Sequence, residues 1–231
     1  MSEESAFRLL GPIMVGPSSS HTAGAVRIGR MAREIHGKPP KEVTIYLHGS
    51  FAETWKGHGS DKALIGGLLG FHTYDKRIKE ADVYAEEAKM NVTFKRIDLG
   101  TKYHPNSIKI VIEDGDEEEP TEIIGESVGG GDIVIRLIMG FPSEITGDLN
   151  TIVLCHRDYL GTLSQITQTV VEFNLNIVAL RSKDLPRLEK ALTTLEIEQK
   201  IPPEIREKLL EIKGMQLVRI LPKISEGEEM F

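Results

Sequence analysis

A loop rich in hydroxyl groups leads into the first helix that the sequence predicts. It runs from Gly16 to Gly24 and reads GPSSSHTAG, with His21 near its centre. Free backbone N–H groups and the positive end of the helix dipole favour a carboxylate or phosphate at a helix start, and the hydroxyl groups of Ser18, Ser19, Ser20 and Thr22 add hydrogen-bond donors. A serine-rich N-cap explains the same residues. A serine nucleophile is disfavoured, because no Gly-x-Ser-x-Gly elbow accompanies the loop.

A second histidine lies between glycines in the stretch KGHGSDK, from Lys56 to Lys62. Gly57 and Gly59 permit the backbone to approach a ligand closely, and they offer no packing reason for the imidazole of His58. The alternative is a glycine loop in which Asp61 caps the next helix and His58 lies in solvent.

The two histidine loops could form one site if both helix starts face the same cavity. The helix starts would hold the carboxylate of an amino acid and leave His21 and His58 near its Cα atom. A helix N-terminus disfavours imidazolium, so either histidine could stay neutral and act as the base that removes a proton. The pair could equally be two metal ligands that lack a third.

Two further turns carry residues of interest. In Tyr103 to Ser107 (YHPNS), the side chain of Asn106 offers both a donor and acceptors to a ligand. In Ser127 to Gly131 (SVGGG), the glycines suggest a bulge or a close approach of backbones. Turn chemistry explains both stretches comparably well.

The elements that must position these residues indicate an α+β domain with a mainly antiparallel sheet. Apolar spacing predicts a helix over 23–36, a strand over 42–48 and a helix from residue 60 or 61 to 70. Strands are expected at 91–98, 107–112, 121–128 and 132–139. The acidic stretch 113–120 separates two alternating apolar runs, so it is interpreted as an exposed hairpin loop inside this domain.

A second domain is expected to begin within the stretch FPSEITGDL at 141–149, which gives domains of 1–147 and 148–231. Its pattern predicts the order βαββαβ, a ferredoxin-like sheet with helices on one face. Leu163, Ile166, Val170 and Phe173 should form the inward stripe of its first helix. The turn that contains Leu160 and Gly161 could hold an amino-acid carboxylate at that helix start, and Asn176 follows the helix. A plain glycine turn is the alternative.

Composition excludes several classes of function. The 231 residues carry a net charge of −7 with no basic face, which argues against nucleic acid or an anionic membrane as partner. No leader pattern or membrane-length apolar run is found, so we expect a cytoplasmic protein. The single cysteine, Cys155, cannot supply the thiolates of a zinc or iron–sulfur site and is expected in the core. We therefore expect no metal ligands in this chain.

The four motifs GPSSSHTAG, KGHGSDKA, YHPNS and SVGGG, followed by the βαββαβ unit, resemble the beta chain of two-subunit iron–sulfur L-serine dehydratases. The resemblance covers nearly the whole chain. It implies an N-terminal domain similar to the allosteric-substrate-binding domains of some phosphoglycerate dehydrogenases and a C-terminal ACT domain. It also implies a separate alpha subunit that carries the [4Fe-4S] cluster, in agreement with the single cysteine here.

The reaction that the resemblance implies is conversion of L-serine to pyruvate and ammonia. An open iron of the cluster would act on the substrate hydroxyl, and a base would take the Cα proton. By matching motifs, His21 and His58 would contribute acid–base chemistry or substrate contacts at the interface with the alpha subunit. Binding would be assisted by Ser18, Ser19, Ser20, Thr22, Gly57 and Asn106.

The regulatory ligand of the ACT domain would contact Leu160, Gly161 and Asn176, and such domains commonly pair through their sheets, so self-association is expected. A non-enzymatic amino-acid sensor that controls another partner is the competing hypothesis.

Overall fold

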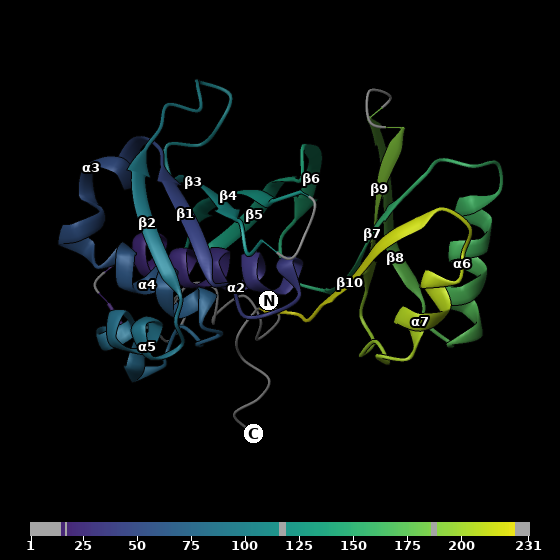
Figure 1. Cartoon of the computed structure of the whole chain (residues 1–231), viewed down its shortest axis with the longest axis horizontal. Helices are drawn as coiled ribbons and strands as arrows, with labels where there is room; N and C mark the ends of the chain where they lie inside the picture. Colours follow the sequence, from purple (N-terminus) through teal and green to yellow (C-terminus); the bar gives the residue numbers. More distant parts are fainter. Residues whose placement is uncertain (1–14, 17, 116–118, 186–188, 225–231) are drawn as a thin grey trace, which may run out of the picture. The chain divides into compact units, whose positions relative to one another are not determined.

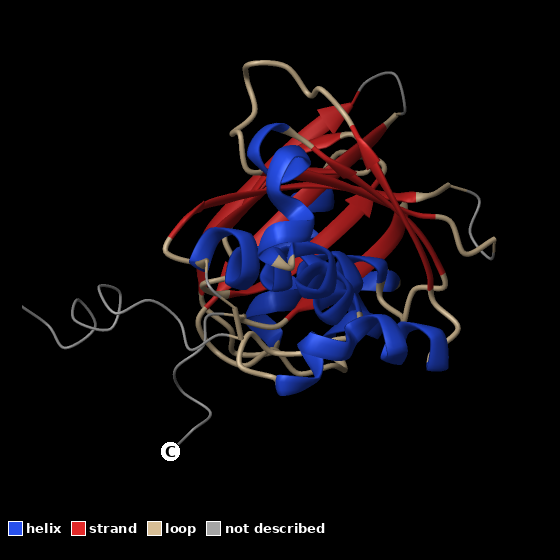
Figure 2. Cartoon of the chain, turned by 90° about the vertical axis from the view of Figure 1, so that its left-hand side faces the viewer, coloured by secondary structure: helices blue, strands red, loops and turns tan. Residues whose placement is uncertain are grey.

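The computed structural model describes residues 15–16, 18–115, 119–185 and 189–224 (Figure 1). Pro17 of the first motif and residues 116–118 of the acidic stretch lie outside these ranges. The chain divides into two compact units, Met1–Thr146 and Gly147–Phe231. It contains both α-helices and β-strands (Figure 2), which agrees with the predicted α+β class, and the strands form two sheets. No helix within the described ranges is long and apolar enough to cross a membrane.

Unit 1 contains a six-stranded sheet with the order β2-β1-β3-β4-β5-β6. Its strands are β1 (Glu42–Leu47), β2 (Asn91–Arg96), β3 (Ser107–Ile112), β4 (Thr121–Gly129), β5 (Asp132–Ile138) and β6 (Phe141–Ile145). β1 and β2 are parallel, and every other neighbouring pair is antiparallel. β3 and β4 form the predicted hairpin around the acidic stretch, with Ile112 paired to Thr121.

The helical elements of unit 1 are the π-helix η1 (Ser19–Ala23), α2 (Gly24–His36), α3 (Gly49–His58), α4 (Ser60–Leu68), the 3-10 helix η2 (Lys76–Glu80) and α5 (Ala81–Glu87). α2 supplies the core with fully buried residues at helical spacing, among them Ile28, Met31 and Ile35. It packs on β4, where Gly125 makes room for Ile28: a Cβ atom on Gly125 would lie 2.9 Å from Ile28 Cγ2. α2 therefore packs closely against one face of the sheet.

Five elements in the described part of unit 1 were not predicted: η1, α3, η2, α5 and β6. α3 buries only Phe51 completely and contains two glycines, so it lacks the apolar stripe that identifies a helix. α5 buries only two alanines, Ala81 and Ala85. The stretch FPSEI was interpreted as the beginning of a boundary, yet it forms β6 at the edge of the sheet. Pro142 is tolerated there because none of the described strands pairs with the outer side of β6.

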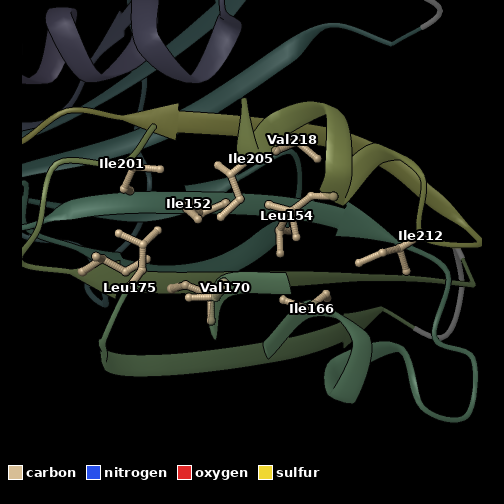
Figure 3. Packing of buried hydrophobic residues seen from close by; sticks show 12 residues of the cluster. Ile152, Leu154, Ile166, Val170, Leu175, Ile201, Ile205, Ile212 and Val218 are labelled. Carbon is tan, nitrogen blue, oxygen red and sulfur yellow. The ribbon is translucent and has the colours of Figure 1, made fainter. Parts of the chain in front are cut away.

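Unit 2 has the predicted element order βαββαβ. Its elements are β7 (Asn150–His156), α6 (Thr162–Glu172), β8 (Ile177–Leu185), β9 (Lys190–Ile197), α7 (Ile205–Leu210) and β10 (Met215–Leu221). The four strands form an antiparallel sheet with the order β10-β7-β9-β8. The core between sheet and helices includes Ile152, Leu154, Ile166 and Val170 (Figure 3).

The predicted inward stripe of α6 is partly wrong. Ile166 and Val170 are fully buried and Phe173 packs against the core, but Leu163 is 38% exposed. Leu163 lies in the first turn of α6, next to Leu160 in the preceding loop, which is fully exposed. The core of unit 2 therefore does not extend to this end of α6. Cys155 is buried in β7, as predicted.

Candidate active site

His21 lies in the short π-helical segment η1 at the start of α2. The side chain of Ser18 caps this turn by accepting a hydrogen bond from the His21 N–H, at 3.2 Å. The same Ser18 Oγ lies 3.3 Å from His21 Nδ1, and Ser50 Oγ lies 3.1 Å from His21 Nε2. Both ring nitrogens of His21 therefore have hydroxyl partners. The N-cap interpretation of the first motif describes Ser18 well.

His58 is the last residue of α3 and not part of a glycine loop, so the expected setting of this histidine was wrong. Gly59 ends α3 in the left-handed conformation, with φ of 68°, and also serves as the N-cap of α4. Asp61 is in the first turn of α4 and is not its cap. His58 Nδ1 is buried and has no hydrogen-bond partner within the described residues. One polar atom of this imidazole is thus left without the partner that burial normally demands.

The two histidine rings lie side by side, with centroids 5.0 Å apart and planes inclined by 36°. Phe51 also packs against the His21 ring, with ring centroids 4.8 Å apart. Burial, followed by the charge of His58, lowers the pKa of His21 below its ordinary value. The arrangement favours a neutral His21 next to His58. A proton on His58 would therefore not be repelled by a positive charge on His21.

The YHPNS turn lies against the beginning of α3. The Pro105 carbonyl accepts a hydrogen bond from Ser50 N–H at 2.9 Å, and the Asn106 carbonyl accepts one from Ser127 N–H at 2.9 Å. The backbone of Asn106 also donates to His104 Nδ1 at 3.0 Å. The side-chain amide of Asn106 makes no hydrogen bond within the described residues, so it remains available to a ligand.

The SVGGG turn is held by α2. A Cβ atom on Gly24 would lie 2.2 Å from Ser127 Oγ, so only glycine allows this contact between α2 and β4. Arg27 Nη1 donates a hydrogen bond to the Gly131 carbonyl at 2.7 Å. The same nitrogen forms an ion pair with Asp132 Oδ1 at 3.5 Å. All four motifs are therefore connected: the first to the second through the histidines, and the third and fourth through Ser50, Ser127 and Gly131.

Several residues of this region were missed by sequence reasoning. Ser50 and Phe51 hold the His21 ring, and Glu126 accepts from His104 N–H at 3.0 Å while it pairs with Arg136 at 2.7 Å. Ser50 follows Gly49, directly after the predicted strand over 42–48. This position at the end of a strand is the one local feature of the sequence that could have identified Ser50 as a site residue. Buried Glu126 and Arg27 carry no such signal, since charged residues usually lie at the surface.

The remaining candidate ligand residues differ in accessibility. Ser18, Ser19 and Ser20 are half-buried, whereas Gly57 is exposed, and a Cβ atom there would contact nothing within 4 Å. Thr22 is 2% exposed, and its Oγ1 is buried without a hydrogen-bond partner in the described part of the chain. Ser18, Ser19, Ser20 and Gly57 are therefore accessible in this conformation, and Thr22 is enclosed.

The candidate regulatory residues of unit 2 lie at opposite ends of α6. Gly161 caps the start of α6 with φ of 86°, and Leu160 before it is fully exposed. Asn176 follows the end of the helix, and its N–H donates to Gln199 Oε1 at 3.3 Å. At 1.5 Å per residue, the two ends of α6 are about 16 Å apart. One copy of unit 2 does not bring these residues to a single small ligand.

Metal-ligating side chains do not gather in the described ranges: no three His, Cys, Asp or Glu residues there could share a metal ion. Cys155 is the only cysteine of the chain, and it is 6% exposed within β7 of unit 2. A [4Fe-4S] cluster needs several thiolates. The residues of this chain therefore do not fit such a cluster.

Comparison with known proteins adds a family to this geometry. The family model described as serine dehydratase beta chain matches residues 5–136. The probable L-serine dehydratase beta chain of Bacillus subtilis is 42% identical over 217 residues, covering 93% of this chain and 96% of the relative. The L-serine dehydratase beta chain of Peptoniphilus asaccharolyticus is 40% identical, covering 92% and 96%.

A longer relative matches over only half of its length. The L-serine dehydratase of Streptomyces coelicolor is 29% identical over 91% of this chain and 50% of the relative. Among solved structures, the ACT domain from the GTP pyrophosphokinase of Chlorobium tepidum has a TM-score of 0.28 and 22% identity, covering 35% of this chain and 92% of that domain. A TM-score this low does not establish a shared fold.

Proposed function

Because the chain belongs to the serine dehydratase beta chain family, we propose that it is the beta subunit of an L-serine dehydratase. In this proposal it works with a separate alpha subunit in the cytoplasm to convert L-serine to pyruvate and ammonia. The alignment of this chain with half of the Streptomyces coelicolor relative supports a second polypeptide that provides the other half. The observation that carries the proposal is the contact between His21 and His58 at the junction of four motifs.

His58 is the better candidate for the base that takes the Cα proton of L-serine. None of the described residues hydrogen-bonds to its ring, and burial of Nδ1 leaves Nε2 as the nitrogen available to a substrate. His21 has both nitrogens engaged by hydroxyl groups and a lowered pKa. A neutral His21 avoids repulsion when His58 becomes imidazolium, which suits a base that is protonated during the reaction.

The polar groups around the histidines suit a small zwitterion. The free amide of Asn106 can both donate and accept hydrogen bonds. Ser19 and Ser20 lie in the first turn of η1, where backbone N–H groups favour a carboxylate. In this proposal these groups, together with Ser18 and Gly57, orient L-serine with its Cα–H towards His58. Thr22 is enclosed, so η1 would have to move before the Thr22 hydroxyl could contact L-serine.

The [4Fe-4S] cluster is proposed to belong to the alpha subunit, because the residues of this chain do not fit it. Gly57 lies on the exposed face of α3 next to His58, with open space around its Cα atom. A helix glycine without a packing contact costs about 1 kcal/mol relative to alanine. Close approach of the alpha subunit would explain its presence beside the proposed base.

Unit 2 is proposed to be an ACT domain that senses an amino acid and mediates self-association. Its βαββαβ order and antiparallel sheet support this proposal. Since Gly161 and Asn176 lie at opposite ends of α6, the ligand would be enclosed only when a second copy brings its own strand to the exposed Leu160 loop.

Reconstitution tests the proposed reaction. The chain should form no pyruvate alone and should gain L-serine dehydratase activity with its cysteine-bearing alpha subunit under anaerobic conditions. His58→Ala in that complex should lower kcat by about 10²–10⁴-fold. His72→Gln is the matched control, because His72 contacts Arg30 and Tyr74. A complex with unchanged rate in His58→Ala would remove His58 from the mechanism.

The competing function is a non-enzymatic amino-acid sensor. The exposed Leu160 loop and the open space around Gly161 favour a ligand site in unit 2. Saturable binding of L-serine to the chain, measured by calorimetry, together with failure to activate any cluster-bearing partner, would support the sensor and contradict the enzyme subunit.

A further inference from the structure

α3 contacts the ring of His21 from both of its ends. Ser50 and Phe51, in the first turn, provide the hydroxyl at 3.1 Å from Nε2 and an aromatic contact at 4.8 Å. His58, at the last position of α3, lies 5.0 Å away between ring centroids. Phe51 is fully buried and fills space beside the ring, but packing alone does not fix the rotation of an imidazole about its own axis. The hydrogen bonds of its two nitrogens with Ser18 and Ser50 restrict that rotation.

The backbone that carries Ser50 is itself fixed by the YHPNS turn. Ser50 N–H donates to the Pro105 carbonyl at 2.9 Å, and the Ser50 carbonyl accepts from Thr54 Oγ1 at 2.8 Å. Gly49 has φ of 53°, and a Cβ atom there would lie 2.5 Å from the Pro105 carbonyl oxygen. Only glycine allows α3 to begin this close to the turn. The Ser50 hydroxyl is therefore held at a defined place relative to His21.

We propose that Ser50 is a positioning residue for the histidine pair: its hydroxyl holds the ring orientation of His21 and accepts from Nε2–H, which favours the tautomer in which Ser18 Oγ donates to Nδ1. The partner of one imidazole nitrogen determines the tautomer and therefore the character of the other nitrogen. Without Ser50, only Ser18 remains as a hydrogen-bond partner, at 3.3 Å from Nδ1. The His21 ring could then turn relative to His58 and change the environment of the proposed base.

The first test needs only the full chain. Side-chain ¹⁵N shifts of His21, measured by NMR at a pH where the ring is neutral, report the tautomer directly. One tautomer should dominate in the native chain, whereas Ser50→Ala should shift both nitrogen signals towards the values of a freely exchanging imidazole. Ser50→Thr should restore the native pattern. Glu53→Ala is the matched control: Glu53 is exposed in the same helix, and its replacement should leave the His21 signals unchanged.

Circular dichroism first establishes that each variant is folded, and Ser50→Cys replaces Ser50→Ala if the alanine variant does not fold. A folded Ser50→Ala or Ser50→Cys chain whose His21 signals equal those of the native chain would overturn the assignment of Ser50.

The second test rests on the proposed function and uses the complex with the alpha subunit. Ser50→Ala should lower kcat by about ten- to a hundredfold, since small displacements of catalytic groups have effects of this size, with a much smaller change in KM. Ser50→Thr should recover most of the rate, and the control variant Glu53→Ala should keep the native rate. Native kcat in Ser50→Ala would overturn a positioning role in the reaction. A native complex without any dehydratase activity would refute the proposed function, and the NMR result would still decide whether Ser50 positions His21.

Discussion

His36 Nε2 lies 3.1 Å from Asp114 Oδ2, and both side chains are buried, with exposures of 0% and 1%. His36 ends α2, and Asp114 belongs to the hairpin between β3 and β4, so this contact ties the main helix of unit 1 to the acidic stretch. His36 Nδ1 also lies 2.9 Å from Thr121 Oγ1. Asp114 Oδ1 accepts from the backbone N–H groups of Lys41 and Glu42, at 2.8 and 3.1 Å.

This network predicts a loss of stability in acid. Burial raises the pKa of Asp114, but the hydrogen bonds from Lys41, Glu42 and His36 outweigh it and hold the pKa below its ordinary value. A carboxylate with a lowered folded pKa stabilises the protein above its unfolded pKa of about 3.9 and loses that contribution as pH falls through the folded pKa.

Asp114→Asn should therefore reduce the free energy of unfolding by about 1.5–3 kcal/mol at pH 7, the cost of losing hydrogen bonds to a charged group. Urea denaturation should show that the difference from the native chain shrinks below about pH 4. Asp98→Asn is the control, because Asp98 lies 3.7 Å from His48 but is 89% exposed. A difference that stays constant from pH 7 to pH 3 would contradict the role given to Asp114.

Glycines at the contact of α2 and α4 set the distance between these helices. A Cβ atom on Gly67 would lie 2.2 Å from the Val26 carbonyl oxygen, and one on Gly29 would lie 2.6 Å from the Leu64 carbonyl oxygen. Gly67→Ala should lower the free energy of unfolding by about 1–3 kcal/mol, because the helices must separate. Gly57→Ala, which meets nothing within 4 Å, should raise it by up to about 1 kcal/mol. Equal urea midpoints for the two variants would refute this packing.

We expect unit 2 to self-associate through β8, which lies at one edge of its sheet. Val178 and Leu180 are 50% and 39% exposed on this edge, and an unpaired edge with apolar side chains favours pairing with another chain. Val178→Lys should lower the sedimentation coefficient of the chain at micromolar concentration. Val83→Lys is the matched control, since Val83 is also 50% exposed but lies on α5 of unit 1. Loss of association in Val83→Lys alone would place the contact in unit 1.

Much of the framework could be predicted from local patterns. Alternating apolar residues identified β3 and β5, where one face of the sheet is buried, and helical spacing identified α2. The proximity of His21 and His58 was a hypothesis from the two motifs, and the ring separation of 5.0 Å supports it. Patterns of this kind succeed where a long face of an element is buried, because burial imposes its period on the sequence.

The parts that were missed depend on contacts between distant segments. α3 is defined at its start by Gly49 against Pro105 and at its end by Gly59, and neither contact leaves a periodic pattern. The link from Arg27 to the Gly131 carbonyl joins α2 to a turn far along the chain, so nothing next to Arg27 in the sequence indicates it. The tertiary structure must be known before such residues can be assigned to a site.

The proximity of the two histidine rings also predicts that replacing His58 changes the pKa of His21. Burial and the charge of His58 both lower the pKa of His21. His58→Gln removes the second cause, so the pKa of His21 should rise but remain below 6.5, which NMR titration of the His21 ring measures. The unfolded chain binds this proton more readily than the folded one, so stability should fall as pH drops below about 6.5, and less steeply in His58→Gln. An unchanged His21 pKa in His58→Gln would show that the rings do not interact electrostatically.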